Sequence, residues 1–131
     1  MNARLAEAAA SLLGVPFRLH GRDPATGLDC VGLVAVAMER AGYRSFAPQG
    51  YALRTGDWSR FNCHFRSSGL EPVERDGDVW LAQVHPVQFH LLIAAEAGAI
   101  HAHAGLRRVT FMPEPLTWPI VARWRLPVER T

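Results

Sequence analysis

The stretch Asp29-Cys30-Val31-Gly32-Leu33-Val34-Ala35-Val36-Ala37-Met38-Glu39-Arg40-Ala41-Gly42 decides the fold of this chain. It opens on Asp, which can accept hydrogen bonds from the free N–H groups of a helix start. It closes on a basic residue and then Gly, which readily adopts the left-handed conformation that ends a helix. Because the residues between are almost continuously apolar, we expect a core helix with Asp29 as N-cap and Gly42 just past its end.

Upstream of this helix the sequence predicts a shorter amphipathic helix over residues 2–13. Leu5, Leu12 and Leu13 recur at helical spacing, and Gly14 with Pro16 ends the pattern. Residues 14–28 contain three Gly and two Pro, so we expect a loop there.

Downstream, the sequence predicts one more helix and then a series of strands. A further amphipathic helix is expected near 57–68, where the residues at i, i+3, i+4 and i+7 are Trp58, Phe61, Asn62 and Phe65. From Gly77 onward, short runs rich in Val, Ile, Leu, Phe and Trp alternate with turn residues. Strands are predicted at 78–84, 88–95, 99–104, 107–112 and 119–126. Helices followed by strands indicate an α+β fold with an antiparallel sheet.

Composition restricts the classes of function. The 131 residues suit a single domain over 1–131, and 49% apolar content is enough for a core. A net charge of +2 provides no electrostatic footprint for nucleic acid or an anionic membrane. All 14 basic residues are Arg, which excludes lysine-based catalysis. Glu7 interrupts the N-terminal apolar run, so we expect no signal peptide and synthesis in the cytoplasm.

Cys30 would lie in the first turn of the core helix, where free N–H groups and the helix dipole favour a thiolate. Both can bring the pKa of Cys30 below its ordinary value. The charge of Asp29 works against this if it is close and unpaired, whereas an N-cap would direct that charge to backbone N–H groups. Gly32 would let a substrate backbone approach closely. The alternative is that Cys30 is simply a small buried apolar residue, and position alone does not separate the two.

A nucleophilic Cys needs a base, and the histidines of two adjoining strands are the strongest choices. His90 lies in an otherwise apolar strand, and His101 and His103 follow a predicted hairpin turn at 95–98. If the turn has an even number of residues, all three histidines lie on one face of the sheet; an odd number would separate His90 from the others.

Three His and one Cys could also bind zinc. Their spacing matches no compact ligand motif, so we expect no metal and no cofactor.

These residues occur in an ordered set that resembles the NlpC/P60 family of papain-like cysteine peptidases. The segment Leu13-Gly14-Val15-Pro16-Phe17-Arg18, then Gly21, then Gly27-Leu28-Asp29-Cys30-Val31-Gly32-Leu33-Val34 is similar to the family's G-x-P-Y…G…D-C-S-G-L-V signature. Gly77-Asp78-Val79, His90-Leu91-Leu92-Ile93 and Ile100-His101-Ala102 resemble its later G-D-[LV], H-V-[GA]-I and I-H-A motifs. The order and spacing agree over residues 5–112.

The resemblance implies a papain-like α+β fold, with N-terminal helices packed on an antiparallel sheet or half-barrel. It also implies roles: Cys30 as nucleophile, His90 as general base and His101 as the residue that orients His90, with His103 as the alternative third residue. Phe17 and Asp29 map to positions that line the stem-peptide site in relatives, and Asp29 would meet a substrate amine.

Three positions depart from the family pattern. Phe17 replaces the usual Tyr, Val31 replaces a Ser, and His20 stands where Gly is common. These changes bear on substrate detail. Cys63 matches no motif and is expected to be a core thiol, and the tryptophans, including Trp118 and Trp124, are expected to be core residues.

The resemblance implies a cell-wall endopeptidase that cleaves an amide of the peptidoglycan stem peptide, at the D-Glu–diaminopimelate linkage. The C-terminal segment 118–127 is similar to short members encoded among phage-tail or gene-transfer-agent genes, so a tail particle and its proteins are expected partners and carriers. Two alternatives stay open: an inactive tail-assembly component, and a related thiol amidase or acyltransferase.

Overall fold

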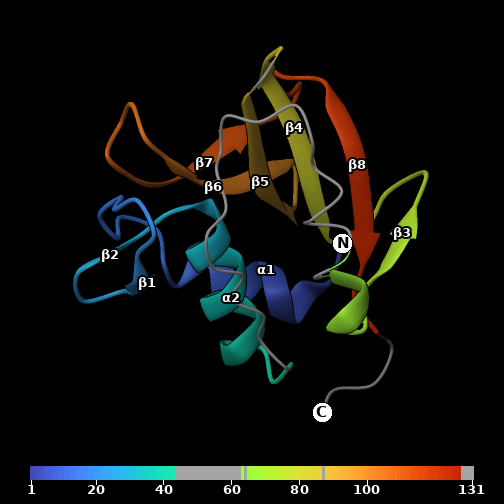
Figure 1. The fold of residues 1–131 in the computed structure, drawn as a ribbon, viewed down its shortest axis with the longest axis horizontal. Coiled ribbons are helices and arrows are strands. Elements are labelled where there is room, and N and C mark those ends of the chain that lie inside the picture. Colours follow the sequence, from blue (N-terminus) through green and yellow to red (C-terminus); the bar gives the residue numbers. More distant parts are fainter. Residues whose placement is uncertain (44–62, 64, 87, 128–131) are drawn as a thin grey trace.

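The computed structural model describes residues 1–43, 63, 65–86 and 88–127. The helices are α1 (Ala3–Ala10) and α2 (Cys30–Arg40), and the strands are β1 (Arg22–Asp23), β2 (Gly27–Leu28), β3 (Glu71–Val73), β4 (Val79–His85), β5 (Gln88–Ala95), β6 (Gly98–His103), β7 (Arg108–Pro113) and β8 (Ile120–Arg125). Six strands form one antiparallel sheet in the order β3-β8-β4-β5-β6-β7. Helices and sheet form separate parts (Figure 1), so the α+β prediction is confirmed.

Helix α2 begins and ends as the sequence predicts. The Asp29 side chain accepts a hydrogen bond from the N–H of Gly32 at 2.8 Å. At the other end Gly42 has a φ of 88°, and the N–H of Tyr43 donates to the carbonyl of Met38. The N–H of Gly42 also donates to the carbonyl of Glu39, and the two bonds together form a Schellman motif, which ends the helix through local chemistry alone.

Helix α1 is shorter than predicted. It begins after Asn2, whose side chain accepts from the N–H of Leu5, and it ends at Ala10 rather than at residue 13. Residues 11–14 form a turn instead, and the N–H of Gly14 donates to the carbonyl of Val109 in β7. The contact with the sheet therefore ends the helix one turn earlier than its apolar periodicity suggests.

The main core lies between the helices and one face of the sheet. Leu5, Leu33 and Met38 of the helices pack with sheet residues that include Leu91 and Ile93. The opposite face of the sheet carries a second, smaller cluster of Ala82, Leu92 and Ala99, against which Trp80, Leu116, Trp118 and Ile120 pack. Alternation along each strand decides which face a side chain joins.

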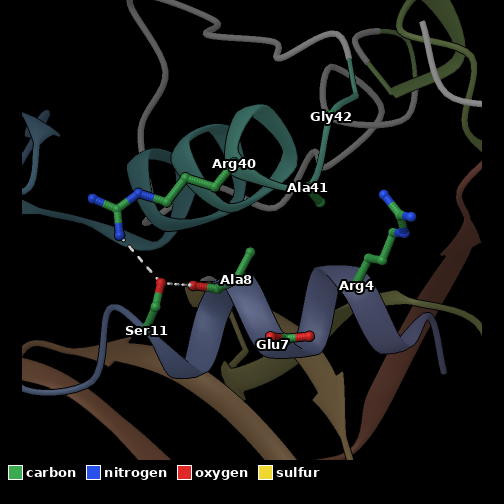
Figure 2. Close-up of a pocket in the computed structure, with 7 residues that line it drawn as sticks. All are labelled: Arg4, Glu7, Ala8, Ser11, Arg40, Ala41 and Gly42. Carbon is green, nitrogen blue, oxygen red and sulfur yellow. Dashed lines mark hydrogen bonds between the residues drawn. The ribbon is translucent and has the colours of Figure 1, made fainter.

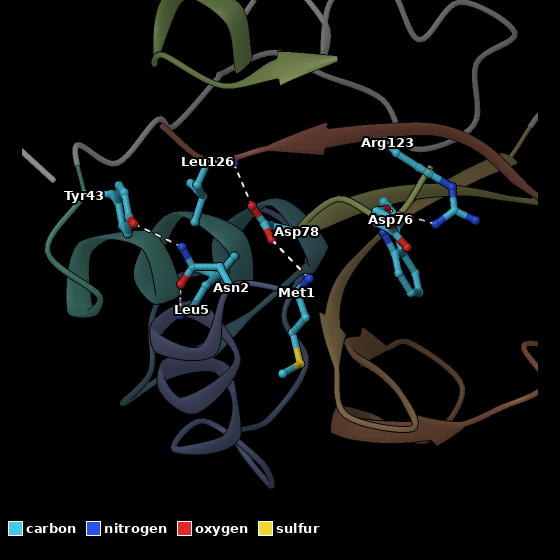
Figure 3. Close-up of polar contacts among 9 residues, drawn as sticks. Met1, Asn2, Leu5, Tyr43, Asp76, Asp78, Arg123 and Leu126 are labelled. Carbon is cyan, nitrogen blue, oxygen red and sulfur yellow. Dashed lines mark hydrogen bonds and ion pairs between the residues drawn. The ribbon is translucent and has the colours of Figure 1, made fainter. Parts of the chain in front are cut away.

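Asp78, the residue before β4, links this strand to the last strand, β8, by hydrogen bonds. This carboxylate is buried and accepts from the N–H of Leu126 at 2.8 Å, as Figure 3 shows. The N–H of Asp78 itself donates to the carbonyl of Trp124. The Gly77-Asp78-Val79 motif thus holds the C-terminal strand beside β4.

Several sequence predictions are corrected. Residues 14–28 are not all loop, because β1 and β2 pair with each other. Strand β3 was not predicted; within the described ranges its three residues pair with β8 alone, and they have little apolar character. Of the helix predicted near 57–68, residues 63 and 65–67 are helical, and Trp58, Phe61 and Asn62 lie outside the described residues. Cys63 is exposed, so the prediction of a core thiol is wrong.

Candidate active site

Cys30 is the first residue of α2, and its side chain is buried. Its position follows from the cap on the helix: Asp29 precedes it in extended conformation, and the carbonyl of Asp29 accepts the N–H of Leu33. The cap therefore places the thiol at the end of α2 where unpaired backbone N–H groups gather.

Burial raises the pKa of Cys30 to about 12, and the negative charge of Asp29 adds to the rise. The backbone N–H groups of Leu91, Val31 and Cys30 act in the opposite direction and lower it. Of the two opposing effects, the one that raises the pKa is the larger, because the loss of hydration and the charge of Asp29 outweigh the helix terminus. At neutral pH the thiol keeps its proton.

Asp29 is completely buried and bonded to its own chain. One oxygen accepts from the N–H of His20 at 2.8 Å, and the other accepts from Gly32 and from the guanidinium of Arg22 at 3.1 Å. The carboxylate thus caps α2 and anchors the segment before it. Contact of Asp29 with a substrate amine stays a prediction.

The histidines lie on β5 and β6, which are joined by the two residues Glu96 and Ala97. This turn has an even number of residues, so the predicted alternation is confirmed: His90, His101 and His103 share one face. Nε2 of His90 lies 2.9 Å from Nδ1 of His101, and the two rings are nearly perpendicular at 86°. The hairpin therefore joins the two histidines by a hydrogen bond.

This pair lies beyond the point where the two strands separate. The β5–β6 ladder pairs Ala95 with Gly98 and ends at Ile93 and Ile100, although both strands continue. Cys30 belongs to the core on the helix-covered face, and it lies close enough to the N–H of Leu91 for this group to lower its pKa. The thiol thus lies beside the residue that follows His90. Within the described part of the chain, no hydrogen bond joins Cys30 to a ring nitrogen of His90.

Both paired histidines are neutral at neutral pH. Burial, and then the charges of His101 and His103, lower the pKa of His90 to about 3. Burial and then His103 lower the pKa of His101 to about 4. A neutral imidazole donates from one nitrogen and accepts at the other. If Nε2 of His90 donates to His101, its Nδ1 is left as the acceptor that a general base requires.

The other predicted residues take different places. The Nδ1 of His103 accepts from the N–H of Leu106 at 3.0 Å, and its ring lies 5.2 Å from that of His101. Phe17 is half-buried against the main core, and its N–H donates to the carbonyl of Arg107.

Gly32 does not provide space for a substrate, so that prediction is wrong. It is buried, and a Cβ there would lie 2.0 Å from the carbonyl oxygen of Gly21. The chain itself fills the space, and Gly32 allows α2 to pack on the segment that also holds Asp29.

No family model and no curated protein matches the chain. Among solved structures it is similar to the NlpC/p60 domain of the peptidoglycan hydrolase SagA (21% identity, TM-score 0.63, covering 94% of this chain and 98% of that one). It is also similar to NlpC1 from Trichomonas vaginalis (19% identity, TM-score 0.66, covering 94% of this chain and 42% of that one) and to an NlpC/P60 family protein from Bacillus cereus ATCC 10987 (20% identity, TM-score 0.61, covering 95% and 40%). The chain has the NlpC/P60 fold. It spans nearly all of the SagA domain and less than half of the other two proteins.

Two residues of this NlpC/P60 fold enter the site without a signal in the sequence. Arg22 pairs with Asp29, and no spacing rule links the two. Trp118 was expected in the core, but it is half-buried and lies against the rings of His90 and His101. By contrast, Trp124 is completely buried, as predicted.

Other features of the fold lie away from this cluster. A cavity of about 520 Å³ between α1 and the C-terminal end of α2 is lined by Arg4, Glu7, Ala8, Ser11, Arg40, Ala41 and Gly42 (Figure 2). In the described residues no three His, Cys, Asp or Glu side chains are grouped to hold a metal ion. Among the described helices, none is long and apolar enough to cross a membrane.

Proposed function

We propose that the chain is a cysteine hydrolase that cleaves an amide bond in peptidoglycan stem peptides, with Cys30, His90 and His101 as its catalytic group. The hydrogen bond between His90 and His101, beside the strand position that contacts Cys30, is the observation on which this proposal depends. It leaves Nδ1 of a half-buried, neutral imidazole to act as a base, one residue along β5 from the N–H that acts on the thiol.

In the first step Sγ of Cys30 attacks the carbonyl carbon of the scissile amide while His90 takes the thiol proton at Nδ1. Backbone N–H groups at the start of α2 stabilise the oxyanion. His90 then delivers the proton to the leaving nitrogen as the C–N bond breaks, which leaves a thioester on Cys30.

In the second step a water molecule attacks the thioester. His90 accepts a proton from the water, and the C–S bond breaks. The proton returns to Sγ, and the product leaves as a carboxylic acid. His101 keeps its hydrogen bond to Nε2 throughout, so the ring of His90 retains one orientation and one tautomer.

The fold neighbour SagA is described as a peptidoglycan hydrolase, which supports peptidoglycan as the substrate class. Within that class we propose the D-Glu–diaminopimelate linkage. The thiol of Cys30 and the imidazole of His90 are both neutral before the reaction, because the pKa of Cys30 is raised to about 12 and that of His90 is lowered to about 3. Proton transfer then accompanies attack and needs no preformed ion pair.

The test is digestion of purified peptidoglycan and of synthetic stem peptides, with products identified by mass spectrometry. We expect wild type and Cys63→Ser to release the same fragments, and Cys30→Ala and His90→Ala to release none. Cys63→Ser is the matched control, because it removes the exposed cysteine only. Equal digestion by Cys30→Ala would overturn the proposal, and the position of the new termini identifies the bond.

The complete burial of Cys30 favours a second candidate, a catalytically inactive component of a tail-like particle. This candidate predicts intact peptidoglycan after long incubation with wild type, together with co-purification of tail proteins. Release of an amine without a new carboxylate, and with acyl transfer to a second amine, would instead identify a thiol acyltransferase.

A further inference from the structure

Trp118 completes a triangle of aromatic rings with the two paired histidines. Its ring centroid lies 5.7 Å from that of His90 and 5.5 Å from that of His101, at interplanar angles of 83° and 87°. The two imidazoles are themselves 5.0 Å apart at 86°. Every pair in the triangle is thus in the edge-to-face arrangement that aromatic rings favour.

The backbone around Trp118 is held by β4. The carbonyl of the next residue, Pro119, accepts the N–H of Gln83 at 3.0 Å, and Ile120 pairs with Ala82. Ala82 in turn lies opposite His90 in the β4–β5 ladder. The indole is therefore attached to the same part of the sheet as the histidine that it contacts.

Trp118 does not behave as a core residue. Trp124 is completely buried and packs on Phe65 at 4.5 Å. Trp118 is half-buried, belongs to the smaller cluster and contacts histidine rings. A half-exposed indole contributes less to stability than a buried one, so contact with the histidines is the more specific role for this side chain.

A hydrogen bond between two neutral imidazoles is weakened when water can compete for either nitrogen. An indole has no charge to titrate, so its effect on its neighbours is to exclude water and to restrict their rotation. The lowered pKa values of His90 and His101 agree with such exclusion, because burial is the largest cause for each.

Among the described residues, the charged groups that act on the pair are histidines of the same β5–β6 hairpin. His103 of β6 lowers the pKa values of both His90 and His101, and its ring lies 6.4 Å from that of Trp118. Strand β4 places Ala82 opposite His90. A change at Trp118 therefore alters hydration without altering the charge on the elements that surround the pair.

We propose that Trp118 is a positioning residue that shields the His90–His101 hydrogen bond from water and holds the His90 ring in the orientation of a general base. The inference rests on the proposed function for its catalytic meaning. Its physical content, shielding and orientation, is measurable without any activity.

The test compares Trp118→Leu and Trp118→Phe with Trp80→Leu and wild type. Trp80 packs against the same cluster, but it contacts Arg123 rather than a histidine, so it is the matched control. Titration of the imidazole nitrogens by NMR should show the pKa values of His90 and His101 rising from about 3 and about 4 by more than one unit in Trp118→Leu only. Trp118→Phe should retain most of the wild-type values.

Hydrolysis of stem peptides adds a second readout. We expect kcat to fall by about 10- to 100-fold in Trp118→Leu, with KM nearly unchanged and the acid limb of the pH profile moved upward. The inference would be overturned if folded Trp118→Leu kept the wild-type pKa values of His90 and His101. It would also be overturned if Trp80→Leu shifted those pKa values by an equal amount. If the NMR shift appears but wild type hydrolyses nothing, the proposed function fails and the shielding role stands.

Discussion

Nε2 of His90 lies 2.9 Å from Nδ1 of His101, on two strands whose ladder has already ended at Ile93 and Ile100. The two rings therefore have different roles. The nitrogen of His90 that contacts His101 is not available to the thiol, so only its other nitrogen can act on Cys30.

Replacement of His101 tests that assignment. His101→Asn retains a side-chain oxygen that can accept from Nε2 of His90, whereas His101→Leu does not. We expect kcat for stem-peptide hydrolysis to fall by about 100-fold in the Leu variant and by much less in the Asn variant. If kcat fell equally in both variants, His101 would not contribute by accepting a hydrogen bond from Nε2 of His90.

Acid should destabilise the fold through the paired histidines. Their pKa values in the fold are about 3 and about 4, below the ordinary 6.5. The unfolded chain therefore binds more protons between pH 6.5 and about 3, so the free energy of unfolding falls as pH decreases through this window and levels off below it.

Urea unfolding at a series of pH values between 7 and 4 measures this effect. We expect His90→Gln to show a shallower dependence than wild type. The control is His85→Gln, which makes the same replacement at an exposed imidazole at the end of β4. Identical slopes for wild type and His90→Gln would contradict the prediction.

The two cysteines should differ sharply in reactivity towards a small thiol reagent. Cys63 is exposed, whereas Cys30 is buried with its pKa raised to about 12. The thiolate is the reactive form, so near pH 8 we expect one fast-reacting thiol in native protein and two after denaturation. Cys63→Ser should abolish the fast reaction. Rapid labelling of native Cys63→Ser would show that Cys30 is accessible and ionised.

A methyl group at position 32 should destabilise the protein. Ala in place of Gly normally stabilises a helix by about 1 kcal/mol. Here the added Cβ would lie 2.0 Å from the carbonyl oxygen of Gly21, so we expect Gly32→Ala to lower the free energy of unfolding by roughly 1–3 kcal/mol.

Thermal and urea unfolding of Gly32→Ala and Gly14→Ala distinguish the cost of a steric contact from the cost of an unfavourable backbone conformation. Gly14 has a φ of 89° with nothing within 4 Å of an added Cβ, so its variant measures backbone strain alone. Stability at or above wild type in Gly32→Ala would mean that α2 can move away from Gly21 without cost.

Local chemistry accounts for what the sequence could predict. Asp29 and Gly42 define the ends of α2 because their hydrogen bonds reach only a few residues along the chain. His90 and His101 share a face because the turn between their strands has an even number of residues, and alternation then decides the rest. The order of the motifs also predicted the α+β fold that the solved NlpC/P60 structures share.

Only the tertiary structure decided the properties that depend on neighbours distant in sequence. The helix terminus alone would lower the pKa of Cys30, but burial by the sheet and the charge of Asp29 raise it. Gly32 faces Gly21 rather than a substrate, and Trp118 reaches the histidines through its attachment to β4. Periodicity and capping describe contacts within one element. Desolvation, close packing and ring contacts arise between elements, so no local pattern in the sequence specifies them.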